Sequence, residues 1–594
     1  MKRVLVTLGV LFLAFQLFAQ RNEGRFLRDA VGEKSYPAAP RVAQRVGMVP
    51  AVVLPSAEST VPERIAALQA WNGSGREPVQ NGFKRALPDA IELRLSGPIA
   101  AKKTAANFGR GVLAATDHGT IVWSTVVQVE KAHRLRLHLE NVNLPEGTTL
   151  WVYGAGEAPI GFGRELLDDR MTLWTPSTHG ETVYLDVEVP SDRANVSFVI
   201  REVLELVEVG RLGLIQPQDA PTCLIDSICV GASTFDAIAN VHRAIAHLEF
   251  VTPAGGAVCT GGLLNDRAGS GTPYLLTANH CFSDQSAASS LEAYFDFTTT
   301  SCNGSYDGTT APHTSGAQWL ASSPNSDFTF IRLNSVPSGR YLLGWDPRST
   351  SVTGGVTLYR LSHPVPASTI FPQMYSSTSV DTTFGQCTGR QRPNYIYSTG
   401  GQGGVYGGSS GSPVMLAGGY VVGQLFGSCG PDPEAGCDQR NATVDGAFSQ
   451  TYNSITTWLE AGSPAQPTVC VPSSTTACVL AGRFQVKVRY RAGFDNNPVD
   501  TDAVVKSVSG FGSASYETAF FYFNSENNIE LLLKILDQGN TDSQGRPTIA
   551  VLFGTATPLR IELTVTDTKT GAVKQYSSAF GSMAGKTDFT AFLK

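Results

Sequence analysis

Alternation of apolar and polar residues predicts β-strands along most of the chain. From about Ala86 to Leu206 the alternating segments are evenly spaced and are separated by turn sequences such as NLPEG. Strands with one apolar and one polar face, joined by short turns, are typical of a β-sandwich. The clearest segments are TIVWSTVVQV, RLRLHLENV, TTLWVYGAG and ETVYLDVEVP. We therefore expect an N-terminal β-sandwich over residues 85–210.

Two further regions carry strand patterns. Residues 220–463 contain short strands and end in NSITTWLE, in which Ile455, Trp458 and Leu459 have the spacing of a helix. After GSPAQP, a linker by composition, residues 467–594 alternate again in FQVKVRYR, TAFFYF, IELLLKILD and TIAVLFG. The pattern predicts an all-β chain whose central unit is flanked by a β-sandwich and by a C-terminal β-sandwich-like accessory domain.

The first residues have the pattern of a secretory signal. Lys2 and Arg3 precede an apolar run from Val4 to Phe18, and the small residue Ala19 follows. The run is short for a membrane anchor, and no later segment is long and apolar enough to span a bilayer. We expect a signal peptide over residues 1–19 and a secreted protein, extracellular or at a bacterial cell surface.

Residues 20–84 show little periodicity and mix Arg, Pro, Ala and Ser. This composition predicts an extended pro-region or linker. A short helix is possible around Val61 to Trp71.

Length, charge and cysteine content narrow the class of protein. The 594 residues exceed what one core can hold. A formal net charge of −6 implies no nucleic-acid partner. Ten cysteines in an exported chain favour disulfides. No CxxC or HExxH motif occurs, so the sequence predicts neither a metal site nor a cofactor.

His280 is a candidate catalytic residue because of its place at the end of an apolar strand. YLLTANHCF, Tyr274 to Phe282, is an apolar strand that ends in His280 and Cys281. A disulfide from Cys281, for which Cys259 in AVCTGGLL is the expected partner, would fix the imidazole in place. The alternative is an ordinary histidine at a strand end. His133, His138 and His179 have no partner pattern and are expected to be structural or exposed.

An aspartate and a serine follow His280 in chain order. Asp327 in NSDFTFIRL begins an alternating strand, where its carboxylate could orient the histidine, although an aspartate before a strand is usually a turn residue. GGSSGSPVM places Ser410 between glycines that permit a tight turn. The N–H groups of Gly408 and Ser410 could then form an oxyanion hole. The order His280, Asp327, Ser410 is the order of chymotrypsin-like proteases.

Residues from Cys223 to about Leu459 resemble the lysyl endopeptidase branch of the chymotrypsin-like serine proteases. The motifs that carry the resemblance are CLIDSIC, LTANHC, SDFTFIRL, GWDPR, GSSGSP and GQLFGSC. The resemblance implies a double β-barrel. It also implies a serine endopeptidase in which Ser410 attacks, His280 transfers protons and Asp327 orients His280. Leu425, Phe426 and Gly427 would form the edge strand that pairs with an extended peptide substrate.

The resemblance also suggests how the cysteines pair. It implies three disulfides, Cys259–Cys281, Cys229–Cys302 and Cys223–Cys429, and leaves Cys387 and Cys437 to pair with each other. Cys470 and Cys478 lie eight residues apart and are expected to close a small loop at the entrance of the C-terminal domain.

The sequence departs from the family at two places. Ser409 stands where most chymotrypsin-like zymogens carry an Asp, and the lysyl endopeptidase branch shares this serine. Activation through an ion pair between that Asp and a new N-terminus therefore cannot operate. If the precursor is latent, its N-terminal units must block the cleft or be needed for folding. We expect the pro-region to be removed by cleavage near residues 210–222. Thr443 stands where the branch places the Asp that receives a lysine side chain, with Asp445 or Asp438 as substitutes if the loop shifts. Phe426 replaces a histidine of the branch.

Three functions remain open at this point. The first is a secreted serine endopeptidase for protein or peptide substrates, with cleavage after a basic residue (Lys or Arg) as one option for its specificity. The second is a catalytically idle protease-fold binding protein with adhesive β-domains. The third is an esterase that uses the same three residues. The C-terminal domain is expected to bind a cell surface or another protein, or to be purely structural.

Overall fold

The computed structural model describes residues 21–594 except 73–77, 100, 118, 193–194, 207–220, 307–310, 367–369, 461–469, 471, 481, 492–500, 507–516, 543–545, 570–571 and 579. The chain divides into two compact units, Met1–Glu460 and Ala461–Lys594. The expected signal peptide and most of the expected cleavage region near 210–222 lie outside the described residues. Within the described ranges, no helix has the length and apolar character needed to cross a membrane.

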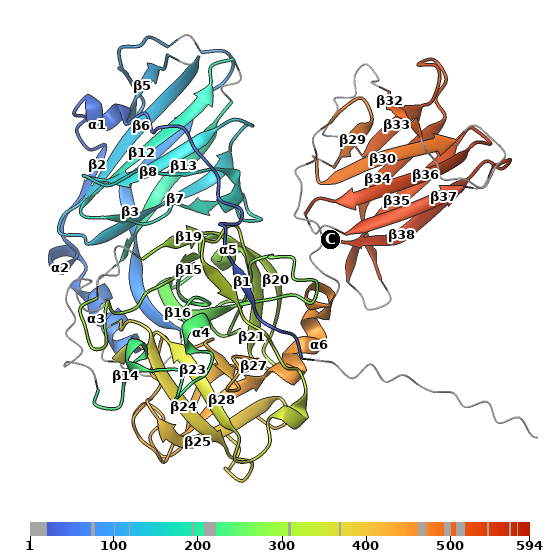
Figure 1. The fold of residues 1–594 in the computed structure, drawn as a ribbon. Helices are drawn as coiled ribbons and strands as arrows, with labels where there is room; N and C mark the ends of the chain where they lie inside the picture. Colours follow the sequence, from blue (N-terminus) through green and yellow to red (C-terminus); the bar gives the residue numbers. More distant parts are fainter. Residues whose placement is uncertain are drawn as a thin grey trace, which may run out of the picture. The chain divides into compact units, whose positions relative to one another are not determined.

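The N-terminal part of the first unit is the expected β-sandwich (Figure 1). Side chains from two layers, among them Trp123, Leu137 and Phe198, form one buried core. One layer contains β2 (Val52–Leu54), β4 (Ala106–Phe108), β5 (Gly111–Ala115), β6 (Thr120–Val129), β8 (Thr149–Gly154), β9 (Ile160–Phe162) and β12 (Thr182–Pro190). The other contains β3 (Val79–Arg94), β7 (Arg134–Asn143), β10 (Leu173–Trp174), β11 (Thr178–His179) and β13 (Ser197–Leu206).

The central part of the first unit is built from two groups of antiparallel strands. The first group contains β15 (Ile245–Thr252), β16 (Gly255–Leu264), β17 (Tyr274–Thr277), β18 (Glu292–Tyr294), β19 (His313–Ser315), β20 (Ala317–Ser323) and β21 (Phe328–Leu333). The second contains β14 (Ile225–Asp226), β23 (Thr357–Ser362), β24 (Met374–Val380), β25 (Tyr395–Gln402), β26 (Pro413–Met415), β27 (Val421–Cys429) and β28 (Ala442–Ala447). Pairing of β24 with β25 closes this second group into a barrel. The result is the expected chymotrypsin-like double β-barrel.

Short helices complete the central part. The predicted C-terminal helix is α6 (Phe448–Leu459), and its buried residues include Ile455 and Leu459. The remaining helices are α4 (Ile238–Val241), α5 (Gln285–Ser289), and the 3-10 turns η3 (Ser227–Cys229) and η5 (Ser349–Ser351). A further 3-10 turn, η1 (Arg164–Leu166), lies in the sandwich.

The sandwich and the first barrel share a sheet. β3 pairs with β13 on one side and with β16 on the other, where Val79 lies opposite Val258 and Gly82 opposite Gly256. The backbones approach closely here. Gly255 has a φ of 140°, and a Cβ on it would lie 3.3 Å from the Cα of Phe83. The boundary predicted at residue 84 therefore falls inside a continuous strand.

Residues 20–84 carry more structure than their composition predicts. β1 (Arg25–Leu27) pairs with β22 (Arg340–Leu342), and the backbone of Asn22 exchanges hydrogen bonds of 2.8 and 3.0 Å with Trp345. The segment then forms α1 (Val42–Arg45), α2 (Ala57–Thr60) and α3 (Pro62–Asn72), the last at the predicted helix position. The segment is thus anchored on the barrels before it enters the sandwich.

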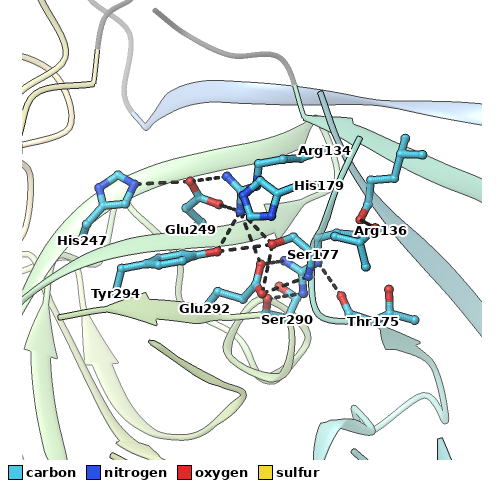
Figure 2. Close-up of polar contacts among 12 residues, drawn as sticks. Arg134, Arg136, Thr175, Ser177, His179, His247, Glu249, Ser290, Glu292 and Tyr294 are labelled. Atoms are coloured by element: carbon cyan, nitrogen blue, oxygen red, sulfur yellow. Dashed lines mark hydrogen bonds and ion pairs between the residues drawn. The ribbon is translucent and has the colours of Figure 1, made fainter. Parts of the chain in front are cut away.

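Charged side chains are buried where the sandwich meets the first barrel (Figure 2). Arg134 on β7 donates to both carboxylate oxygens of Glu249 on β15, at 3.0 and 2.8 Å, and to the hydroxyl of Tyr294 at 2.7 Å. Arg136 lies 3.6 Å from the carboxylate of Glu292 on β18. Two arginines of the sandwich therefore face two glutamates of the barrel in a region with little access to water.

The second unit is a β-sandwich with its own core, as the alternating sequence predicts. Residues of β30 alternate between buried and more exposed along its length. One sheet contains β29 (Thr476–Val479), β30 (Phe484–Arg491), β31 (Thr501–Asp502), β36 (Arg560–Asp567) and β37 (Val573–Ser578). The other contains β32 (Val504–Val505), β33 (Thr518–Tyr522), β34 (Leu531–Thr541), β35 (Pro547–Thr555) and β38 (Gly585–Leu593).

Five disulfides join the ten cysteines. Cys229–Cys302, Cys259–Cys281 and Cys470–Cys478 are formed as expected. The other two expected pairs are wrong, because the structure joins Cys223 to Cys437 and Cys387 to Cys429.

The exchange has a physical reason in the second barrel. Cys429 ends β27 inside an aromatic cluster with Tyr397, whose hydroxyl accepts a 2.9 Å hydrogen bond from the N–H of Cys387. This contact brings Cys387 to Cys429. Cys437 lies in the following loop beside Tyr406, within reach of Cys223.

Candidate active site

His280 and Asp327 are brought together by two paired strands. Antiparallel pairing of β17 with β21 aligns Thr277 with Thr329, so the residues just beyond these ends lie side by side. Asp327 accepts two hydrogen bonds from His280, one from the backbone N–H at 3.0 Å and one at Nδ1, 2.7 Å away. The carboxylate is 5% exposed and the imidazole 18%. The pair therefore fixes the orientation of the imidazole ring and commits Nδ1 to Asp327.

The backbone of Asp327 takes an uncommon conformation. Its φ is 52°, in the left-handed region, which Asp tolerates better than most residues. The carbonyl accepts a hydrogen bond of 3.1 Å from the N–H of Asn279. This turn directs the carboxylate back toward His280 instead of along the strand that follows.

Ser410 lies in a tight turn that depends on glycine. Gly408 and Gly411 have φ values of 87° and 80°, which side chains with a Cβ rarely adopt. A Cβ on Gly411 would lie 2.6 Å from the carbonyl oxygen of Thr260 and 2.7 Å from the N–H nitrogen of Ala278. The turn is therefore packed directly against the end of β17, which leads to His280.

One strand holds both sides of the candidate site. On β16, Cys259 forms the disulfide with Cys281, which follows His280 in the chain. The next residue, Thr260, donates its N–H to the carbonyl of Ser410 at 2.9 Å. Adjacent residues of a buried strand thus fasten the histidine segment and the serine turn, which come from different barrels.

Two amides beside Ser410 are available to an external acceptor. The N–H of Ser409 donates to Tyr406 at 3.0 Å and that of Gly411 donates to Leu425 at 2.9 Å. In this described stretch, the N–H groups of Gly408 and Ser410 have no acceptor within the chain. Two such N–H groups, one on the serine itself and one two residues before it, can hold a negatively charged oxygen.

Ser409 lies beside the turn, at the position where most chymotrypsin-like zymogens carry an Asp. Its buried hydroxyl accepts a 3.0 Å hydrogen bond from Ser362. The hydroxyls of Ser362 and Ser409 thus pair with each other at this position. An Asp here would instead need a cationic partner.

Strand β27 is not the edge strand that the sequence predicted, because it lies between β26 and β28 in the second barrel; it pairs with β26 only as far as Gln424. Leu425 is buried, and its N–H donates to Ser412 at 2.9 Å. The register with β28 shifts between Leu425 and Gly427, so Phe426 has no partner there. The Phe426 ring lies edge-on to His280, with ring centroids 5.5 Å apart. The structure therefore brings Phe426 to the candidate site, and Gly427 follows it with no atom within 4 Å of an added Cβ.

The residues expected to select the substrate side chain lie in less favourable places. Asp445 is fully buried and pairs with Arg360 at 2.7 Å. Burial raises the pKa of Asp445, although Arg360 opposes this. Thr443 contacts the hydroxyl of Ser398 at 2.7 Å. Asp438 pairs with the exposed Arg440.

Arg390 is a site residue that the sequence reasoning missed. Its guanidinium stacks on the Phe426 ring, 4.0 Å from the centroid. It lies in a loop without periodicity, and only the three-dimensional arrangement connects it to His280.

Several known proteases are similar to this chain. A lysyl endopeptidase from Pseudomonas aeruginosa is 26% identical over 466 residues, which is 72% of this chain and 96% of the relative. The HtrA-type protease AlgW with a tripeptide is 13% identical, with a TM-score of 0.29, over 59% of this chain and 96% of that one. The active form of the Rv3671c protease from M. tuberculosis is 12% identical, with a TM-score of 0.25, over 41% and 93%.

Two family models match in chain order. Residues 114–202 match the lysyl endopeptidase N-terminal domain, within the β-sandwich. Residues 218–447 match the lysyl endopeptidase C-terminal domain, which spans the double barrel and the candidate site. Both domains of the lysyl endopeptidases are thus matched in order along the chain, which supports a lysyl endopeptidase-type serine protease.

Proposed function

We propose that this chain is an exported serine endopeptidase that cleaves peptide bonds through an acyl-enzyme on Ser410. The observation that carries the proposal is the double hydrogen bond from His280 to Asp327. It holds the imidazole in the tautomer that can accept a proton at Nε2. A buried carboxylate in this place also stabilises the imidazolium that forms.

The proposed reaction proceeds in two halves. Ser410 Oγ attacks the scissile carbonyl as His280 takes its proton, and the amides of Gly408 and Ser410 stabilise the oxyanion. His280 then protonates the leaving amine, and the peptide bond breaks. Water attacks the acyl-enzyme with His280 again as base, which releases the acid and restores Ser410. No cofactor takes part in this scheme.

We further propose that the chain does not require lysine or arginine before the scissile bond. A desolvated cation needs a carboxylate partner. Asp445 and Asp438 are already paired with Arg360 and Arg440, and Thr443 offers only a hydroxyl. This arrangement favours uncharged side chains in the pocket.

Export and attachment complete the proposal. Five disulfides fit an oxidising compartment outside the cytoplasm. We assign residues 461–594 an attachment role at a cell surface or on another protein, because they form a separate unit with its own core. Removing them should leave hydrolysis of short peptides unchanged and reduce retention on cells.

The test is active-site labelling of the secreted protein with a fluorophosphonate. Wild type should label, Ser410→Ala should not, and Asp327→Asn should lose about 10⁴-fold in kcat. Absence of labelling in the matured wild type would reject catalysis. Digestion of a denatured protein, read by mass spectrometry, then gives the specificity. Cleavage confined to bonds after Lys or Arg would contradict the second part of the proposal.

A further inference from the structure

Arg390 is held in a fixed place beside the candidate site. It lies between β24 and β25, in a loop that the Cys387–Cys429 disulfide fastens to the end of β27. The N–H of Arg390 donates to the carbonyl of Cys387 at 3.0 Å, which closes a turn directly at this disulfide. The position of the side chain is therefore coupled to β27 and not to a free loop.

The guanidinium rests on aromatic rings. It lies 4.0 Å from the centroid of Phe426 and 5.5 Å from that of Tyr395, and Nη1 donates to the carbonyl of Gly389 at 2.9 Å. Stacking on a ring orients a guanidinium while leaving its edge donors open. Phe426 in turn contacts His280 edge-on. The cation thus stands one aromatic ring away from the proposed general base.

Arg390 carries an unbalanced charge in the described part of the chain. No carboxylate among the described residues forms an ion pair with it, although most other arginines near the barrels have one. Its Nε is buried without a hydrogen-bond partner. A fixed, partly buried guanidinium with open donors is suited to a planar carboxylate, which can accept two hydrogen bonds at once.

We propose that Arg390 is a specificity residue that recognises an acidic side chain, Asp or Glu, on the amino-terminal side of the scissile bond. The inference rests on the proposed endopeptidase function. A peptide that pairs with β27 at Phe426 and Gly427, beyond the stretch that pairs with β26, runs past the guanidinium before it reaches Ser410. Its side chains at alternate positions face this surface. A carboxylate there would complete the ion pair that the chain itself lacks.

A matched variant is available in the same loop. Arg392 also stacks on a tyrosine, 4.5 Å from the centroid of Tyr397, but its Nη2 donates to the carbonyls of Asp381 and Phe384 at 2.9 and 3.1 Å. Its Nη2 is thus committed to the backbone. Arg392→Met therefore removes a stacked cation from the loop without removing the proposed recognition.

The experiment digests a peptide library with wild type, Arg390→Met, Arg390→Lys and Arg392→Met, each first titrated with a fluorophosphonate. Wild type should enrich Asp and Glu at one position amino-terminal to the cut. Arg390→Met should lose that enrichment and Arg392→Met should keep it. For matched peptides with Glu or Gln at that position, kcat/KM should differ by about 5- to 20-fold in wild type and less than about 2-fold in Arg390→Met.

The outcomes separate this inference from the proposed function. Wild type that labels and cleaves without acidic enrichment overturns the role of Arg390 and leaves the endopeptidase in place. An equal loss of kcat on both matched peptides in Arg390→Met would show only a positioning role for Phe426 and His280, and would also overturn it. Wild type that neither labels nor cleaves rejects the proposed function itself.

Discussion

Arg134 in the sandwich and Glu249 in the first barrel form a buried ion pair through two hydrogen bonds of 3.0 and 2.8 Å. Burial alone would raise the pKa of Glu249, but Arg134, together with His247, holds it far below its usual range. The carboxylate is therefore ionised at neutral pH. The pair joins two parts of the chain that the sequence presents as separate domains.

Removing one partner of this pair should be costly. Arg134→Met leaves the buried Glu249 carboxyl without its cationic partner, which we expect to destabilise the first unit by about 3–5 kcal/mol. The double variant Arg134→Met/Glu249→Gln should recover part of this loss. Arg201→Ala is the control, since Arg201 is 54% exposed where it pairs with Glu140. It should cost less than about 1 kcal/mol. Denaturant unfolding followed by fluorescence gives the free energy of unfolding of each variant. An equal loss in Arg134→Met and Arg201→Ala would contradict the argument.

The turn at Ser410 should not tolerate a side chain at Gly411. Gly411→Ala places a Cβ 2.6 Å from a backbone oxygen at a φ of 80°, so the serine turn and the end of β17 must move apart. A displacement of about 1 Å in such a site can reduce kcat/KM by about 100-fold. Gly400→Ala is the control, because Gly400 also has a positive φ, 62°, but no atom lies within 4 Å of an added Cβ. It should stay within a few-fold of wild type on a peptide substrate.

The disulfides of the second barrel give a direct chemical test of the fold. Mass spectrometry of unreduced fragments should recover Cys387 linked to Cys429 and Cys223 linked to Cys437. Fragments joining Cys223 to Cys429 would instead support the pairing that the family resemblance suggested. The Cys387–Cys429 link also fixes the loop that presents Arg390, so its loss should weaken any preference for acidic substrates.

Local patterns in the sequence were enough to predict the β-sandwiches, helix α3 and helix α6. They were also enough to name His280, Asp327 and Ser410 as one group, because each has a distinctive neighbourhood and their order is informative. Whether these three act together remains a prediction that the labelling experiment tests.

Features that depend on distant contacts were not accessible from the sequence. The continuation of β3 into the barrel rests on Gly82 facing Gly256, which alternation cannot reveal. The cation–π contact of Arg390 joins a loop to β27 across 36 residues of sequence that carry no shared pattern. Asp445 was a candidate for substrate binding because of its position, and only the structure shows Arg360 beside it.

Stability of the first unit should depend on pH through His363. Its ring is fully buried next to His247, with ring centroids 5.6 Å apart. Burial, reinforced by the charge that His247 can carry, lowers the pKa of His363 well below its usual value. The unfolded chain therefore binds a proton near pH 6.5 that the folded chain does not, so stability falls as the pH drops through this value. Between pH 7.5 and 5.5 the loss should be about 1.4 kcal/mol for this one group.

In His363→Leu that part of the pH dependence should disappear, whereas His313→Gln, at an exposed position, should retain it. The measurement is the denaturant midpoint of each variant at both pH values. An unchanged difference in His363→Leu would assign the acid sensitivity to other groups, of which His242, whose pKa burial also lowers, is the next to test.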